Sequence, residues 1–173
     1  MYIQQTIQWI QSIVISLNLC PFAKYEMDNN KVRIEVSLAT NFAEGIKSFI
    51  EEIDYLNSNP STSTTLLLFP YFLSDFLDYL DFFDLANEAI VKLGQQSIYQ
   101  VATFHPAYQF HGTPIDDVTN YTNRSPYPML HLLREEMLDS AIAYYGNTNA
   151  IPANNILRLR ELGLEGIIKL LPK

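Results

Sequence analysis

The chain has 173 residues, 48% of them hydrophobic and only 17% charged, which is the composition of a compact folded domain and not of a disordered segment. The net charge of −8 disfavours a nucleic-acid partner, since an acidic surface repels phosphate backbones. The single cysteine, Cys20, excludes an internal disulfide, and no apolar run approaches the roughly 18 residues of a membrane span. We therefore predict one domain over residues 1–173, located in the cytoplasm, with neither a nucleic acid nor a membrane as partner.

Hydrophobic spacing predicts two helices and a strand in the first third of the chain. Apolar residues recur every three or four positions over 3–18, which is typical of an amphipathic helix. Residues 32–38 alternate between apolar and polar side chains, as a strand with one polar face does. Asn41 is a favourable N-cap with Glu44 three positions on, so the next helix is expected to begin there and to continue to about residue 56.

Two further strands enclose a third helix. The continuous apolar run 66–69 predicts a central strand that is covered on both faces. Ser74 is placed to cap a helix that should end near 93, where Gly94 is a suitable C′ residue. Residues 99–104 complete the series as another strand.

The last third of the chain has a different texture. Residues 105–128, with four prolines, predict a long irregular loop, and an ordered loop of this length is usually functional. A fourth helix is expected over about 128–145, followed by a break at 146–149. Pro152 then opens a last helix that should stop at Gly163.

This order of elements predicts the fold class. Strand, helix, strand, helix, strand favours parallel β-α-β crossovers, and the polar face of 32–38 indicates either an edge position or helices mainly on one side. We predict an α+β or small α/β fold, an open sandwich with a three- to four-stranded mixed or parallel sheet built from β-α-β units, plus N- and C-terminal helices. A ferredoxin-like arrangement is one form of it.

The side chains best suited to catalysis are concentrated between Phe104 and Glu135. His105 directly follows a predicted strand, and the carboxyl ends of parallel strands face the ligand crevice in open sheets, so His105 is a candidate general acid or base. The alternative is a loop histidine that bonds to the backbone. Tyr108 lines a pocket in the first interpretation and packs the loop onto the core in the second.

A candidate anion site lies further along the same segment. Asn123 and Arg124 lead into the predicted fourth helix, whose N-terminus would add free N–H donors for a carboxylate or phosphate. On that helix His131, Arg134 and Glu135 would share one face. The alternative is an ordinary amphipathic helix with a solvated arginine.

Two other possibilities stay open. Cys20 ends the first predicted helix, where a thiolate is not stabilised, so an inert buried thiol is favoured unless a histidine or arginine approaches it. His111 together with His105 and Asp116 or Asp117 offers ligand types suited to zinc or iron, although the spacing matches no specific metal motif, and we assign no metal ligand.

Three segments are distinctive: LNLCPFA at 17–23, FHPAYQFHG at 104–112 and NRSPYPMLHLLRE at 123–135. With them the chain resembles a bacterial family, domain of unknown function 1415, over nearly its whole length. The resemblance implies a bacterial, cytoplasmic protein of one domain and supplies no activity. The positions that match the family pattern are Cys20, His105, Asn123, Arg124, His131 and Arg134.

The sequence thus predicts an enzyme that acts on a small anionic metabolite, and it names no cofactor. Arg124 and Arg134 would bind the carboxylate or phosphate, and His105 would move a proton with help from His131. The alternatives are a binding module that does not consume its ligand and a protein-interaction domain, which the 11 tyrosines would suit.

Overall fold

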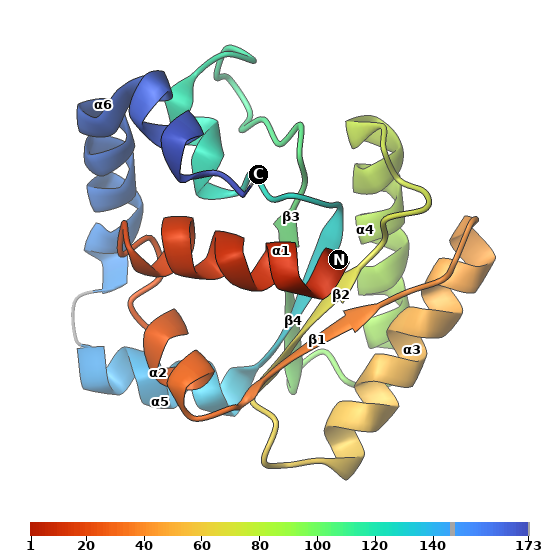
Figure 1. Ribbon diagram of the computed structural model, residues 1–173. Helices are drawn as coiled ribbons and strands as arrows, with labels where there is room; N and C mark the ends of the chain where they lie inside the picture. The colour runs from red at the N-terminus through yellow and green to blue at the C-terminus, as the bar shows by residue number, and fades with distance from the viewer. Residues whose placement is uncertain (146–147, 173) are drawn as a thin grey trace.

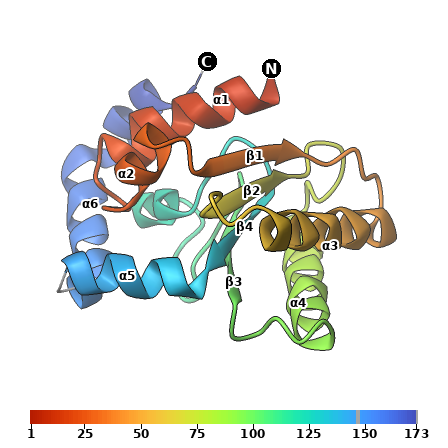
Figure 2. The ribbon, with the colours of Figure 1, turned by 90° about the horizontal axis from the view of Figure 1, so that it is seen from below.

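The computed structural model describes residues 1–145 and 148–172. In it a four-stranded mixed sheet lies between two layers of helices (Figures 1 and 2). The strands stand in the spatial order β1-β2-β4-β3, with β1 and β2 parallel and β4 antiparallel to both of its neighbours. Their bounds are β1 Val32–Val36, β2 Thr64–Leu68, β3 Tyr99–Phe104 and β4 Met129–Arg134.

The predicted α+β class with β-α-β units is confirmed. The connectivity is β-α-β-α-β-β, which differs from the β-α-β-β-α-β order of ferredoxin-like folds. The helical segments are α1 Tyr2–Trp9, the π-helical η1 Ile10–Ile15, α2 Ala23–Asp28, α3 Phe42–Ser58, α4 Phe76–Lys92, the 3-10 turns η2 Val118–Thr122 and η3 Thr148–Ala150, α5 Glu135–Tyr145 and α6 Ile151–Leu170. None of the helices in the described ranges has the length and apolar content needed to cross a bilayer.

Each face of the sheet is buried against its own helices. One face packs against α3 and α4, where Phe49, Phe69 and Phe82 are fully enclosed. The other packs against α1, η1 and α6, around Trp9 and Met129. The predicted edge position of β1 is confirmed. Its polar face is covered too, because Arg33 forms two hydrogen bonds of 2.9 and 3.1 Å with the buried Glu52 of α3.

Helix caps explain where α3 and α4 begin. The side chain of Asn41 accepts a hydrogen bond from the Glu44 N–H at 3.0 Å, as predicted. For α4 the predicted cap, Ser74, is wrong. Asp75 is the cap, and its Oδ1 accepts from the N–H groups of Leu77 and Asp78 at 2.8 and 3.1 Å. A charged carboxylate at the positive end of the helix dipole is a stronger acceptor than a hydroxyl.

The largest departure from the sequence prediction lies at 128–134, which form β4 and not the first turns of a helix. The facing edges of β2 and β3 present backbone groups that only a strand between them can pair, and β4 does so with His131 between Leu66 and Ala102. The α5 helix follows at Glu135 with no intervening turn. A strand that is buried on both faces is a continuous apolar run, and such a run also contains apolar residues at the spacing of a helix. The sequence alone therefore does not distinguish a buried strand from a helix at this position.

The C-terminal helix also differs in part from its prediction. Gly163 interrupts α6 with φ 65° and ψ 172°, but the helix resumes and continues to Leu170. Of the predicted break at 146–149, residues 146 and 147 lie outside the described residues.

Candidate functional site

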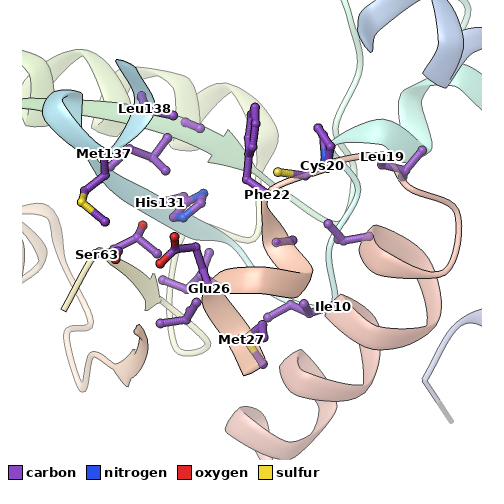
Figure 3. A pocket seen from close by; sticks show the side chains of 18 of the residues that line it. Ile10, Leu19, Cys20, Phe22, Glu26, Met27, Ser63, His131, Met137 and Leu138 are labelled. Carbon is purple, nitrogen blue, oxygen red and sulfur yellow. The ribbon is translucent and has the colours of Figure 1, made fainter. Parts of the chain in front are cut away.

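A cavity of about 330 Å³ lies on the face of the sheet beneath α1, η1 and α2 (Figure 3). Its wall is mainly aliphatic and sulfur-containing, with polar side chains at a few positions. The π-helical η1 contributes Ile10 and Val14 to this wall. Segments of this kind are rare and occur frequently at functional sites. Other apolar residues of the wall are Leu19, Met27, Leu66, Met137 and Leu138.

His131 projects into the cavity from the middle of the sheet. Its neighbours in register are Leu66 on β2 and the small Ala102 on β3, which leaves space above the imidazole. Phe104 lies beside it, with the ring centroids 6.1 Å apart. Within the described ranges no hydrogen bond or ion pair engages the imidazole. Burial lowers the pKa of His131 to about 4, so the ring is neutral at pH 7.

Three polar atoms around the cavity are buried without a hydrogen-bond partner among the described residues. They are Trp9 Nε1, Glu26 Oε2 and Ser63 Oγ. Trp9 is 2% exposed and Ser63 4%. Unpaired buried polar atoms are uncommon in folded proteins because each costs free energy, so three of them around one cavity mark it as a candidate binding site.

Glu26 reaches the cavity from the short helix α2. Its backbone carbonyl accepts from the N–H of Lys31 at 3.0 Å, which fixes the end of α2 against the approach to β1. In Figure 3 the carboxylate extends toward the imidazole of His131, and the Ser63 side chain lies close by. No lysine or arginine of the described chain forms an ion pair with Glu26.

Cys20 lines the same cavity as His131, so the structure brings these two predicted residues together, and the predicted Arg134 borders the cavity as well. Burial is the main cause that raises the pKa of its thiol, while the N–H groups of Phe22 and Ala23 act in the opposite direction. The sulfur is therefore protonated at neutral pH and is a weak nucleophile in this state.

His105 lies elsewhere, on the α4 side of the sheet, and is 1% exposed. Its Nε2 donates to the carbonyl of Leu73 at 2.9 Å, and its Nδ1 accepts from the N–H of Ala107 at 3.0 Å. The imidazole packs against the rings of Phe76 and Tyr79, and burial lowers its pKa. With both nitrogens engaged, His105 fastens the loop to the turn before α4, as in the alternative interpretation of the sequence.

Arg124, Asn123 and Tyr108 organise the long loop. Arg124 donates through Nε to the carbonyl of Tyr108 at 3.1 Å and through Nη2 to that of Ile115 at 2.5 Å. The side chain of Asn123 donates to the carbonyl of Thr103 at 2.9 Å. The Tyr108 hydroxyl is 3.3 Å from the hydroxyl of Thr103. The predicted helix N-terminus beside Arg124 is wrong, because β4 begins there.

Arg134 borders the cavity, but its guanidinium group turns to the C-terminal end of α3. Nε donates to the carbonyl of Thr62 and Nη1 to the hydroxyl of Tyr99, both at 3.0 Å. Nη2 donates to the carbonyls of Leu56 and Asn59. The predicted helical face shared by His131, Arg134 and Glu135 does not exist.

The metal alternative finds no geometric support. Within 1–145 and 148–172, no group of three or more His, Cys, Asp or Glu side chains is placed to hold a metal ion. His111 is exposed on the loop, and Asp117 caps η2 by accepting from the Thr119 N–H at 2.8 Å.

Sequence reasoning selected His131 and Cys20 but missed Glu26, Ser63 and Trp9. Only one local signal pointed to them: Ser63 belongs to a run of serines and threonines that leads directly into a fully buried strand. Glu26 and Trp9 reach the cavity through tertiary contacts that no local pattern shows.

The chain resembles known proteins at the level of a family model. No curated protein and no solved structure matches the chain. A family model described as protein of unknown function (DUF1415) matches residues 1–169 of the 173. The chain therefore belongs to the DUF1415 family.

Proposed function

We propose that the protein binds a small, largely apolar molecule in the cavity around His131. The observation that carries this proposal is the set of three buried atoms without a partner, Trp9 Nε1, Glu26 Oε2 and Ser63 Oγ, on an otherwise apolar wall. Apolar pockets with a few convergent polar groups are the usual form of small-molecule sites, and about 330 Å³ is at the lower end of their volumes.

The carboxylate or phosphate ligand expected from the sequence has less support. Both arginines that would bind it, Arg124 and Arg134, donate to backbone carbonyls instead. The charged side chain that faces the cavity is the acidic Glu26.

A second candidate is an enzyme that exchanges a proton with the bound molecule. The specific observation in its favour is that the imidazole of His131 is neutral, has no hydrogen bond to other described residues, and shares the cavity with a carboxylate. A neutral imidazole can donate or accept a hydrogen bond, and a carboxylate can take up the proton.

Filling the cavity tests the binding proposal. Ala102→Leu adds a larger side chain beside His131, and the same substitution at the exposed Ala43 of α3 is the control. Native mass spectrometry of protein purified from its host should show a bound small molecule in the wild type and the Ala43 variant, and none in Ala102→Leu. An equally occupied Ala102→Leu variant with a native circular dichroism spectrum would contradict the proposal.

The identified molecule then separates the two candidates. In an enzyme it is converted on incubation, and His131→Asn retains binding but loses conversion. In a binding protein it is recovered unchanged.

A further inference from the structure

The cavity has the electrostatic character of a site for a cation. The half-buried Glu26 brings a carboxylate with one buried oxygen, Oε2, to the cavity, and His131 is neutral at pH 7 because burial disfavours its charged form. The guanidinium of Arg134 is occupied at the end of α3. The ammonium of Lys31 lies 5.2 Å from the ring centroid of Tyr25, which is exposed.

Hydrogen-bond acceptors converge on this cavity from three separate elements. Glu26 Oε2 comes from α2, Ser63 Oγ from the residue before β2, and the unprotonated ring nitrogen of His131 from β4. Figure 3 shows these three side chains together on one part of the wall. The apolar part of the wall includes Met27, Met137 and Leu138.

Of the two carboxylate oxygens of Glu26, Oε2 is buried without a hydrogen-bond partner among the described residues. An ionised oxygen removed from water without a hydrogen bond or a counter-charge costs far more than an unpaired hydroxyl. Within the described ranges no basic side chain supplies that partner, so the counter-charge is expected to arrive with the ligand.

We infer that the molecule bound in the cavity is an apolar primary amine, held as its ammonium form by Glu26, Ser63 and His131. An ammonium group has three N–H donors and one positive charge, which match three acceptors and one negative charge. The apolar remainder of the molecule lies against the aliphatic and methionine side chains. This inference rests on the proposed binding function and specifies its ligand class.

Three small probes that share a phenyl group test the inference. Phenethylamine, 2-phenylethanol and 3-phenylpropanoate are similar in size and are cationic, neutral and anionic at pH 7. Binding is measured by titration calorimetry on the full chain, for the wild type, for Glu26→Gln and for Glu165→Gln. Glu165 is an exposed residue of α6 and provides the matched control.

The amine should bind the wild type at least about tenfold more tightly than the alcohol, since charge-assisted hydrogen bonds are about twice as strong as neutral ones. Glu26→Gln should reduce amine affinity to the level of the alcohol and leave alcohol affinity unchanged. Glu165→Gln should change neither. If Glu26→Gln does not fold, Ser63→Ala replaces it and should weaken amine binding several-fold without affecting the anion.

The remaining outcomes separate this inference from the proposed function. Equal binding of amine and alcohol, preference for the carboxylate, or amine binding that Glu26→Gln does not alter would overturn the amine inference. In each of those cases the cavity still binds a small apolar molecule. Failure of all three probes to bind would overturn the inference and the proposed function together.

Discussion

His131 and Arg134 lie three residues apart on β4 and serve opposite faces of the sheet. His131 points into the cavity beneath α1, and Arg134 donates to carbonyls at the end of α3 on the other side. Successive side chains of a strand alternate between faces, so an odd separation divides them. On the helix expected from the sequence, the same spacing would have placed them together. One strand thus supplies the candidate binding group and a structural clamp.

Replacing the clamp should lower stability. Arg134→Met keeps the apolar stem but removes the donors to Leu56, Asn59, Thr62 and the Tyr99 hydroxyl, so we expect the free energy of unfolding to fall by about 2–3 kcal/mol. The control is Arg158→Met, because Arg158 is exposed and makes one such bond, to Leu17 at 3.1 Å. Urea unfolding should show a loss below about 1 kcal/mol for it. Similar losses of unfolding free energy in both variants would contradict the stabilising role of the Arg134 hydrogen bonds.

Two buried serines, each 4% exposed, should respond differently to the same substitution. Ser37 donates to the Ser48 hydroxyl at 2.8 Å and accepts from the Ala39 N–H at 3.2 Å, so Ser37→Ala should destabilise the protein by about 1–2 kcal/mol. Ser63 Oγ has no partner in the described chain, so Ser63→Ala in ligand-free protein should be neutral or slightly stabilising. Thermal unfolding of both variants measures this. A loss at Ser63 equal to that at Ser37 would mean that its hydroxyl is satisfied within the protein.

Stability should decrease in mild acid because of His131. The pKa of His131 is about 4 in the folded state and 6.5 ordinarily. At a pH between these two pKa values, His131 is protonated in the unfolded chain but not in the folded protein. The free energy of unfolding should therefore fall as pH drops from 6.5 toward 4, by up to about 3 kcal/mol. Burial lowers the pKa of His105 as well, and it contributes in the same direction.

Urea unfolding of His131→Leu between pH 7 and 5 isolates this contribution. The range stays above the region in which Glu44 and Asp117, both with lowered pKa values, become protonated. The variant should show a shallower dependence on pH than the wild type. An unchanged slope would show that the imidazole of His131 is hydrated or paired in solution.

The N-cap of α4 gives a paired test of helix initiation. Asp75→Ala removes the acceptor for two N–H groups and should cost about 1 kcal/mol in the free energy of unfolding. Ser74→Ala, one position earlier, should cost only a few tenths. Chemical unfolding of the two variants in parallel measures both losses. A larger loss of unfolding free energy in Ser74→Ala than in Asp75→Ala would show that Ser74 is the N-cap.

Elements governed by local rules could be predicted from the sequence. The alternation in β1, the capping residues of α3 and the positive φ of Gly94 each depend on a few neighbouring residues. The β4 strand could not, because its partners lie far away in the chain, Leu66 being 65 residues before His131. The continuation from β4 into α5 also lacks the glycine or proline that marks a boundary elsewhere.

The candidate site shows the same division. His131 and Cys20 belong to residue types that attract attention in any sequence, whereas Glu26 and Ser63 become notable only when they are found buried and unpaired. Arg124 and Arg134 donate to backbone carbonyls, which attract a guanidinium group as a ligand anion does, and the sequence does not show where backbone carbonyls gather.

The late position of β4 in the chain has a consequence during synthesis. The β4 strand lies between β2 and β3, so these two strands have no pairing partner on that side until residues 129–134 have left the ribosome. During that time β2 presents an unpaired edge in which all five residues are leucine or threonine. Such an edge is a template for pairing with another chain. Nascent chains that stop before residue 129 should therefore associate or recruit a chaperone, whereas completion of β4 closes the sheet and ends that exposure.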